Sequence, residues 1–249
     1  MVQLGVPQYV IWIVCTLLHF FIALIMLRRK LIRTFPVFFA YTSFHAISSV
    51  VSYIVLRVSH AFYFWLYWGS EGADALLTLA VIQELFRVSF FPYQALRRFG
   101  VTIFTWLTIG LCVVAVITPF IAPVTEINET MTVMFTLDRA AQIVELGLVF
   151  SLFVFCRMFG LTWRHYVFGI AAGLGTMTSA GLAVTTVRAW VGQSGNGWWV
   201  VAAPLGFTLG NLVFACYFAS EKSVVPLRIV PRTEQLIAWN RALSHVVGE

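Results

Sequence analysis

The chain has 249 residues, of which 60% are apolar and only 10% are charged, and its mean hydropathy is +0.89. A soluble domain carries about 25% charged residues, so this composition excludes an ordinary water-soluble fold and leaves no room for a second, soluble domain. The net charge of +6 comes from basic residues at the ends of apolar runs, which argues against nucleic acid as a partner.

Seven apolar runs follow one another along the chain, separated by short polar or basic breaks. Each is long enough to cross a bilayer as a helix, and backbone groups within lipid must be hydrogen-bonded internally. The first run has no cleavage site before its basic flank, so we expect it to be retained. The sequence therefore predicts an all-α, polytopic fold: one bundle of seven transmembrane helices over residues 1–220 and a tail over 221–249, with the runs at about 8–27, 36–57, 61–86, 101–122, 131–156, 166–187 and 197–219.

Basic residues gather at alternate helix ends. By the positive-inside rule, the side with thirteen of the sixteen Lys and Arg residues should be cytoplasmic, which places the N-terminus outside and the C-terminus in the cytoplasm. The protein is then a multi-pass protein of the cell inner (plasma) membrane. The thirteen are Arg28, Arg29, Lys30, Arg33, Arg87, Arg97, Arg98, Arg157, Arg164, Lys222, Arg228, Arg232 and Arg241.

The first two spans each contain a histidine near the midplane, His19 and His45. Two histidines at matching depth on adjacent antiparallel helices could serve as axial ligands of a haem or metal, although no cofactor is predicted on other grounds. A buried histidine more often hydrogen-bonds a neighbour or balances a carboxylate. Both alternatives stay open from the sequence.

Spans three and five carry the ionisable residues that are most informative about function. Glu71 and Asp74 lie three residues apart on one face of span three. In span five, Asp138, Gln142 and Glu145 form a single stripe, with Arg139 beside it. Asn211 adds a polar group in span seven.

Each charge near the middle of a span costs about 2.5–3.5 kcal/mol on insertion scales, so these side chains are expected to face one another or water. Four carboxylates exceed the single Arg139, and protonation, a cation or a histidine must supply the balance. One hypothesis is that the charges pair and fix helix register, with Arg139 bridging Glu71 or Asp74. The other is a pocket for a small ligand or a proton, formed by Glu71, Asp74, Asp138, Arg139, Gln142, Glu145 and Asn211.

Small residues recur four apart in the last two spans, at Gly169 and Gly173 and at Gly206 and Gly210. This spacing lets helix backbones approach closely, and we expect the contact to lie within the bundle rather than between two copies. The four cysteines, Cys15, Cys112, Cys156 and Cys216, are expected to act as small apolar residues packed against neighbours.

Beyond span seven, residues 234–247 have an amphipathic pattern that fits a short helix on the inner membrane surface or against a partner. The basic cytoplasmic face could present a second partner surface, although anionic lipid alone suits it. The outer loop contains one formal glycosylation sequon at residues 128–130.

Several stretches together suggest a resemblance: residues 28–41, with the basic turn; 67–87, around Glu71; and 160–173, with the glycine pair. They resemble a group of uncharacterised seven-helix integral membrane proteins of acidobacteria-like bacteria. The resemblance covers most of the chain and implies a bacterial inner-membrane protein, but it implies no activity.

No nucleotide-binding, zinc-protease or serine-hydrolase motif occurs, and no lysine lies within a span to carry retinal. We therefore expect a non-enzymatic, sensor-like or receptor-like protein with a buried polar pocket between spans three and five. The alternatives are an accessory or structural subunit of a larger membrane complex, and a small carrier.

Overall fold

The computed structural model describes residues 6–90, 102, 104–113, 117, 129–158, 165–191 and 199–220. These residues form α-helices and one 3₁₀ turn, with no strand in the described part. The helices are α1 (Val6–Arg28), α2 (Pro36–Val58), α3 (His60–Phe90), α5 (Glu129–Met158), α6 (His165–Val191) and α7 (Trp199–Ser220), the 3₁₀ turn η1 is Leu31–Arg33, and a shorter apolar helix spans Phe104–Val113.

The all-helical prediction is confirmed for this part of the chain, and each predicted apolar run overlaps one of these helices. Five helices, namely α1, α2, α5, α6 and α7, are long and apolar enough to cross a membrane. The 31-residue α3 is not among them; it carries Glu71, Asp74, Glu84 and Arg87. The amphipathic segment 234–247 and the sequon at 128–130 lie largely or wholly outside the described residues.

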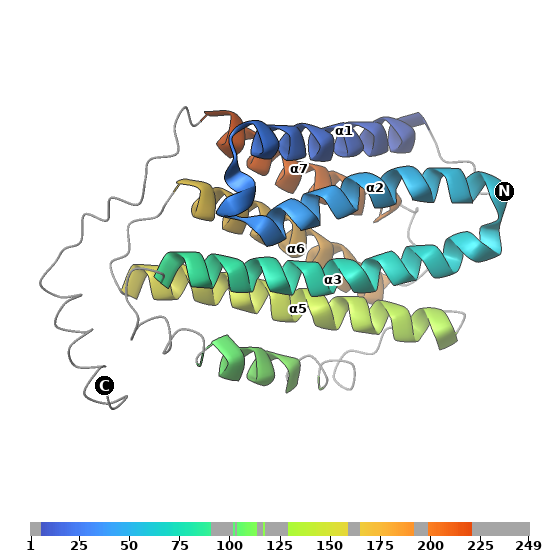
Figure 1. The fold of residues 1–249 in the computed structure, drawn as a ribbon. Coiled ribbons are helices and arrows are strands. Elements are labelled where there is room, and N and C mark those ends of the chain that lie inside the picture. Colours follow the sequence, from blue (N-terminus) through green and yellow to red (C-terminus); the bar gives the residue numbers. More distant parts are fainter. Residues whose placement is uncertain are drawn as a thin grey trace, which may run out of the picture.

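The six long helices run roughly parallel to one another (Figure 1), and their contacts follow a closed ring. Helix α1 contacts α2 and α7, α2 contacts α3, α3 contacts α5 and α6, and α6 contacts α5 and α7. The Phe104–Val113 helix lies against the outside of the ring, where Leu111 occupies the space that a side chain at Gly147 of α5 would need. Residues far apart in sequence therefore meet around one interior.

Two short links set the path of the first three helices. Lys30, two residues after the end of α1, adopts the left-handed conformation (φ 55°), which turns the chain into η1. Ser59 alone separates α2 from α3, and its hydroxyl accepts a hydrogen bond from the amide of Phe62. Helices α2 and α3 must therefore lie side by side and antiparallel.

The side chain of Glu84 in α3 is hydrogen-bonded to the first turn of α2. Its two carboxylate oxygens accept the backbone N–H groups of Val37 and Phe38 at 2.9 and 3.0 Å. These amides have no partner within their own helix, and Pro36 before them has no N–H to satisfy. A side chain from one helix thus acts as the N-terminal cap of its neighbour.

The glycine prediction for spans six and seven is confirmed as a contact within the bundle. A Cβ atom at Gly173 would lie 3.0 Å from the carbonyl oxygen of Gly210, and one at Gly210 would lie 2.7 Å from the carbonyl oxygen of Gly173. Gly206 faces the side chain of Ala180, and Gly169 faces the side chain of Tyr217. Helices α6 and α7 are therefore packed backbone to backbone.

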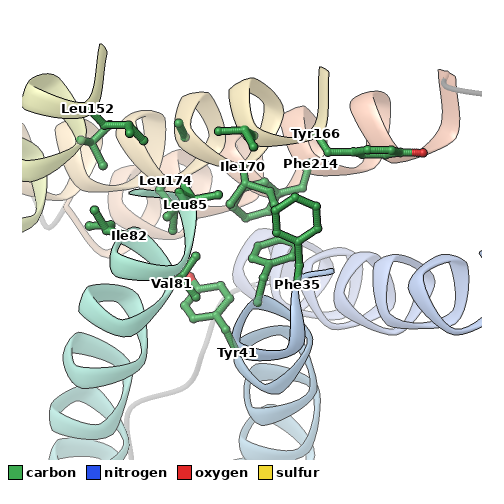
Figure 2. Packing of buried hydrophobic residues seen from close by; sticks show 14 of the residues in the cluster. Phe35, Tyr41, Val81, Ile82, Leu85, Leu152, Tyr166, Ile170, Leu174 and Phe214 are labelled. Atoms are coloured by element: carbon green, nitrogen blue, oxygen red, sulfur yellow. The ribbon is translucent and has the colours of Figure 1, made fainter. Parts of the chain in front are cut away.

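The apolar core fills one end of the ring, the end where α1, α3 and α5 finish in Arg28, Arg87 and Arg157. We call this the basic end. Figure 2 shows side chains of α3 meeting those of α2, α5, α6 and α7 there. The labelled members are Phe35, Tyr41, Val81, Ile82, Leu85, Leu152, Tyr166, Ile170, Leu174 and Phe214.

The outer faces of the helices are apolar as well. On α1 the exposed residues recur every three or four positions along one side, which is the surface that a helix presents to hydrocarbon. Cys112 and Cys216 are also exposed, so the expectation that all four cysteines pack against neighbours is wrong for these two. The exposed α1 residues are Val10, Ile13, Val14, Leu17, Phe20, Phe21, Leu24 and Leu27.

Candidate functional site

Polar side chains from all six long helices lie inside the ring, on the side of the core away from the basic end. Tyr41 marks the boundary: its ring belongs to the core, and its side chain packs against His45, which lies one turn further along α2. We call the following set the polar cluster: Cys15, His19, His45, Glu71, Asp74, Asp138, Gln142, Glu145, Thr178, Thr185 and Asn211.

The closest polar contact in the cluster joins α2 to α3. His45 Nε2 lies 2.7 Å from Asp74 Oδ1, a distance typical of a charge-assisted hydrogen bond. The two side chains keep 15% and 26% of their surface exposed although they face the interior of the ring. Histidine as a partner for one of the surplus carboxylates was one of the sequence expectations, and this contact realises it for His45.

His19 of α1 stacks on His45, with ring centroids 5.0 Å apart and an interplanar angle of 22°. Its Nδ1 atom donates a hydrogen bond to the carbonyl oxygen of Cys15, 2.9 Å away, since a carbonyl can only accept. Stacked rings present their faces to each other, whereas two axial ligands must aim nitrogen lone pairs at one metal. The haem or metal alternative thus requires both rings to turn.

Among the described residues, no group of three or more His, Cys, Asp or Glu side chains is arranged to hold a metal ion.

Asn211 of α7 lies against α1 and not among the acids of α3 and α5. Its amide nitrogen donates to the carbonyl oxygen of Phe207 at 3.1 Å and contacts the Cys15 sulfur at 3.4 Å. The amide is fully buried. The sequence predicts Asn211 in one pocket with the acids; its hydrogen bonds in the described part of the chain go to Cys15 and Phe207, and Cys15 also contacts His19, which stacks on His45, the partner of Asp74.

Helices α5 and α6 form the other side of the cluster. Gln142 donates to both carboxylate oxygens of Asp138, one turn earlier, at 3.1 Å, and accepts a hydrogen bond from Thr185 at 3.2 Å. Glu145 accepts a 3.4 Å hydrogen bond from Thr178 and is only 8% exposed. The side chains of the predicted stripe on α5 therefore lie on one face, where they hydrogen-bond to α6 and interact electrostatically with the acids of α3.

The four carboxyl groups, Glu71 and Asp74 on α3 and Asp138 and Glu145 on α5, form one electrostatic group. Each of them interacts electrostatically with the other three, and Glu71 is also hydrogen-bonded to Tyr67, one turn earlier. Even with Arg139 beside Asp138 and with a protonated His45, four ionised carboxylates would leave two negative charges unbalanced. Charge balance in the cluster therefore requires protons or a cation.

Three members of the cluster were missed by the sequence analysis: Thr178, Thr185 and Cys15. The two threonines lie seven residues apart on α6, which is one helix face, and Cys15 precedes His19 by one turn on α1. These spacings were the available signal. A threonine or cysteine is compatible with an apolar helix, so it carries little weight before its neighbours are known.

Comparison with protein-family models, with curated proteins and with solved structures finds no match for this chain. Its function must therefore be argued from the polar cluster itself.

Proposed function

We propose that the chain is a non-enzymatic, sensor-like or receptor-like protein of a bacterial inner membrane. It crosses the membrane seven times, with the N-terminus outside and the C-terminus in the cytoplasm. Five helices of sufficient length and apolarity, apolar outer faces and the clustering of arginine at one end support this proposal.

The sensing site in this proposal is the polar cluster, which opens toward the outer face and binds a small ligand or a proton. The observation that carries the proposal is the His45–Asp74 contact, because it joins α2 to α3 through two ionisable side chains. Asp74 also belongs to the acid group shared with α5, so a proton or cation bound there changes the contacts of three helices together.

The basic end reports occupancy to a protein partner in the cytoplasm. At this end, Arg29 donates hydrogen bonds to the Tyr166 hydroxyl of α6 and the Ala219 carbonyl of α7, at 3.2 and 3.4 Å. A shift of α1 is thereby passed to the inner ends of α6 and α7, and on to the tail at 221–249.

The test is a pH titration of the protein in lipid nanodiscs, followed by tryptophan fluorescence. Trp68 of α3 packs on Phe135 of α5, with ring centroids 5.4 Å apart, and so reports on the junction of the two helices. Between pH 8 and pH 5 we expect a sigmoidal change in emission as the polar cluster takes up protons.

Substitutions at the acids give the decisive comparison. Asp74→Asn keeps an oxygen acceptor for His45 but removes the charge, and Glu71→Gln and Glu145→Gln each remove one charge from the acid group. We expect each variant to shift or abolish the transition, and the matched control Glu129→Gln, at the first residue of α5, to leave it in place. An unchanged response in all three acid variants would refute the proposal.

Mass spectrometry and an absorption spectrum of gently purified protein test the proposal from another side. A co-purified small molecule supports a receptor. A stoichiometric second subunit together with no pH or ligand response would identify an accessory subunit instead, and a Soret band would identify a haem protein.

A further inference from the structure

Two buried acceptor atoms in the polar cluster have no hydrogen-bond partner within the described part of the chain: His19 Nε2 and Asn211 Oδ1. The residues that carry them are 2% and 0% exposed. A neutral imidazole that donates from Nδ1 presents a lone pair at Nε2, and an amide that donates from its nitrogen presents its carbonyl oxygen. Both atoms therefore require a donor that the described protein does not supply.

The two acceptors belong to one small region. His19 Nδ1 and Asn211 Nδ2 contact the same Cys15 sulfur, at 3.9 and 3.4 Å. The ring of Phe207, one turn before Asn211, lies 5.7 Å from the His19 ring and 5.1 Å from the His45 ring. His45 Nε2 in turn lies 2.7 Å from Asp74 Oδ1. His19 thus lies beside the His45–Asp74 contact, Asn211 lies beside His19 at the Cys15 sulfur, and the Phe207 ring packs against both histidines.

The chemistry of these groups selects one class of ligand. The excess of carboxylates favours a bound cation. The two unpaired acceptors, His19 Nε2 and Asn211 Oδ1, need N–H or O–H donors. Sodium and potassium offer no donor and prefer oxygen ligands, so an imidazole nitrogen suits them poorly. Aromatic faces such as that of Phe207 favour an organic cation.

We infer that the polar cluster binds a protonated primary amine, whose ammonium group donates to His19 Nε2 and Asn211 Oδ1 and is balanced by Asp74. This inference rests on the proposed function, since it names the ligand class of the same site. The amine enters from the outer side, and its alkyl part lies against Phe207.

The experiment is calorimetric titration of the full chain in nanodiscs with methylammonium, tetramethylammonium or potassium chloride. Methylammonium carries N–H donors, tetramethylammonium has the same charge without them, and potassium tests charge alone. We expect methylammonium to bind at least tenfold more tightly than the other two. The variants His19→Phe and Asn211→Leu should each weaken methylammonium binding at least tenfold.

Both substitutions keep a similar side-chain shape and remove an unpaired acceptor together with a donor to a carbonyl of the same helix, so we expect thermal unfolding of these variants to stay close to the wild-type temperature. His165→Phe, at the first residue of α6, is the matched control and should bind methylammonium like the wild type.

Equal binding of tetramethylammonium, or full methylammonium binding by both site variants, would overturn the inference. Absence of methylammonium binding with an intact pH transition in tryptophan fluorescence would overturn the inference and leave the proposed function standing. Absence of both responses would overturn both.

Discussion

Glu84 joins two helices through a single carboxylate. It is 7% exposed, and its two oxygens accept neighbouring backbone amides at the start of α2. Those amides lie at the positive end of the α2 dipole, so a negative charge is favoured there. The acid therefore has a structural role at the basic end, distinct from that of the acids in the polar cluster.

Replacing Glu84 by Gln should destabilise the fold by about 1–2 kcal/mol, because the amide offers one acceptor to two N–H groups and loses the charge. Unfolding in mixed micelles with increasing denaturing detergent measures this loss. Glu129→Gln is the matched control and should change stability little. Equal stability of the Glu84→Gln variant and the wild type would contradict the capping role.

The polar residues could be found from the sequence, but most of their partners could not. Glu71, Asp74 and the α5 stripe stand out because charges are costly in an apolar run. Which group faces Asp74 depends on the rotation of α2 about its axis, and no local pattern records that angle. His45 was one of two histidines that could have balanced an acid, and only packing selects it.

The glycines of α6 and α7 show at the element scale how backbone contact fixes two helices. Gly173 and Gly210 each occupy the space that a side chain of the other would need, with carbonyl oxygens 2.7–3.0 Å from the added Cβ atoms. Glycine in a helix costs about 0.5–1 kcal/mol relative to alanine, and close packing offsets this cost. The glycines of α3 are different, because Gly72 has no atom within 4 Å of its Cβ position.

Gly173→Ala should therefore destabilise the protein by about 1–3 kcal/mol, since the Phe214 ring and the α7 backbone must move away. Gly72→Ala should be neutral or stabilising by up to about 1 kcal/mol. Detergent unfolding of the two variants under the same conditions measures the difference. Similar stabilities would show that α6 and α7 are not in backbone contact.

The positions of the helices along the chain could be predicted from the sequence more accurately than any other feature of the fold. The predicted runs at 36–57 and 166–187 correspond to helices Pro36–Val58 and His165–Val191, because apolar length and flanking basic or proline residues indicate where a span begins; the second helix continues four residues past its predicted end. The closure of α7 onto α1 was not predictable, because the residues that make it, Asn211 and Cys15, are nearly two hundred positions apart.

At the scale of the whole molecule, the ring has two unlike halves. The half near the basic end is filled by a dry core that includes Phe38, Ile82 and Phe214, each 0% exposed. The other half holds the polar cluster, where Asp74 keeps 26% of its side-chain surface. In the proposed orientation, this arrangement closes the molecule on the cytoplasmic side and leaves the cluster accessible from outside.

The proposed topology is what gives the polar cluster an outward opening, so the location of the two chain ends tests the account most directly. Green fluorescent protein fluoresces only in the cytoplasm, and alkaline phosphatase is active only in the periplasm. Each reporter is fused in turn after Glu249 and before Met1. We expect fluorescence without phosphatase activity from the C-terminal fusions, and phosphatase activity without fluorescence from the N-terminal ones. Both ends on the same side, or the reverse pattern, would contradict the account.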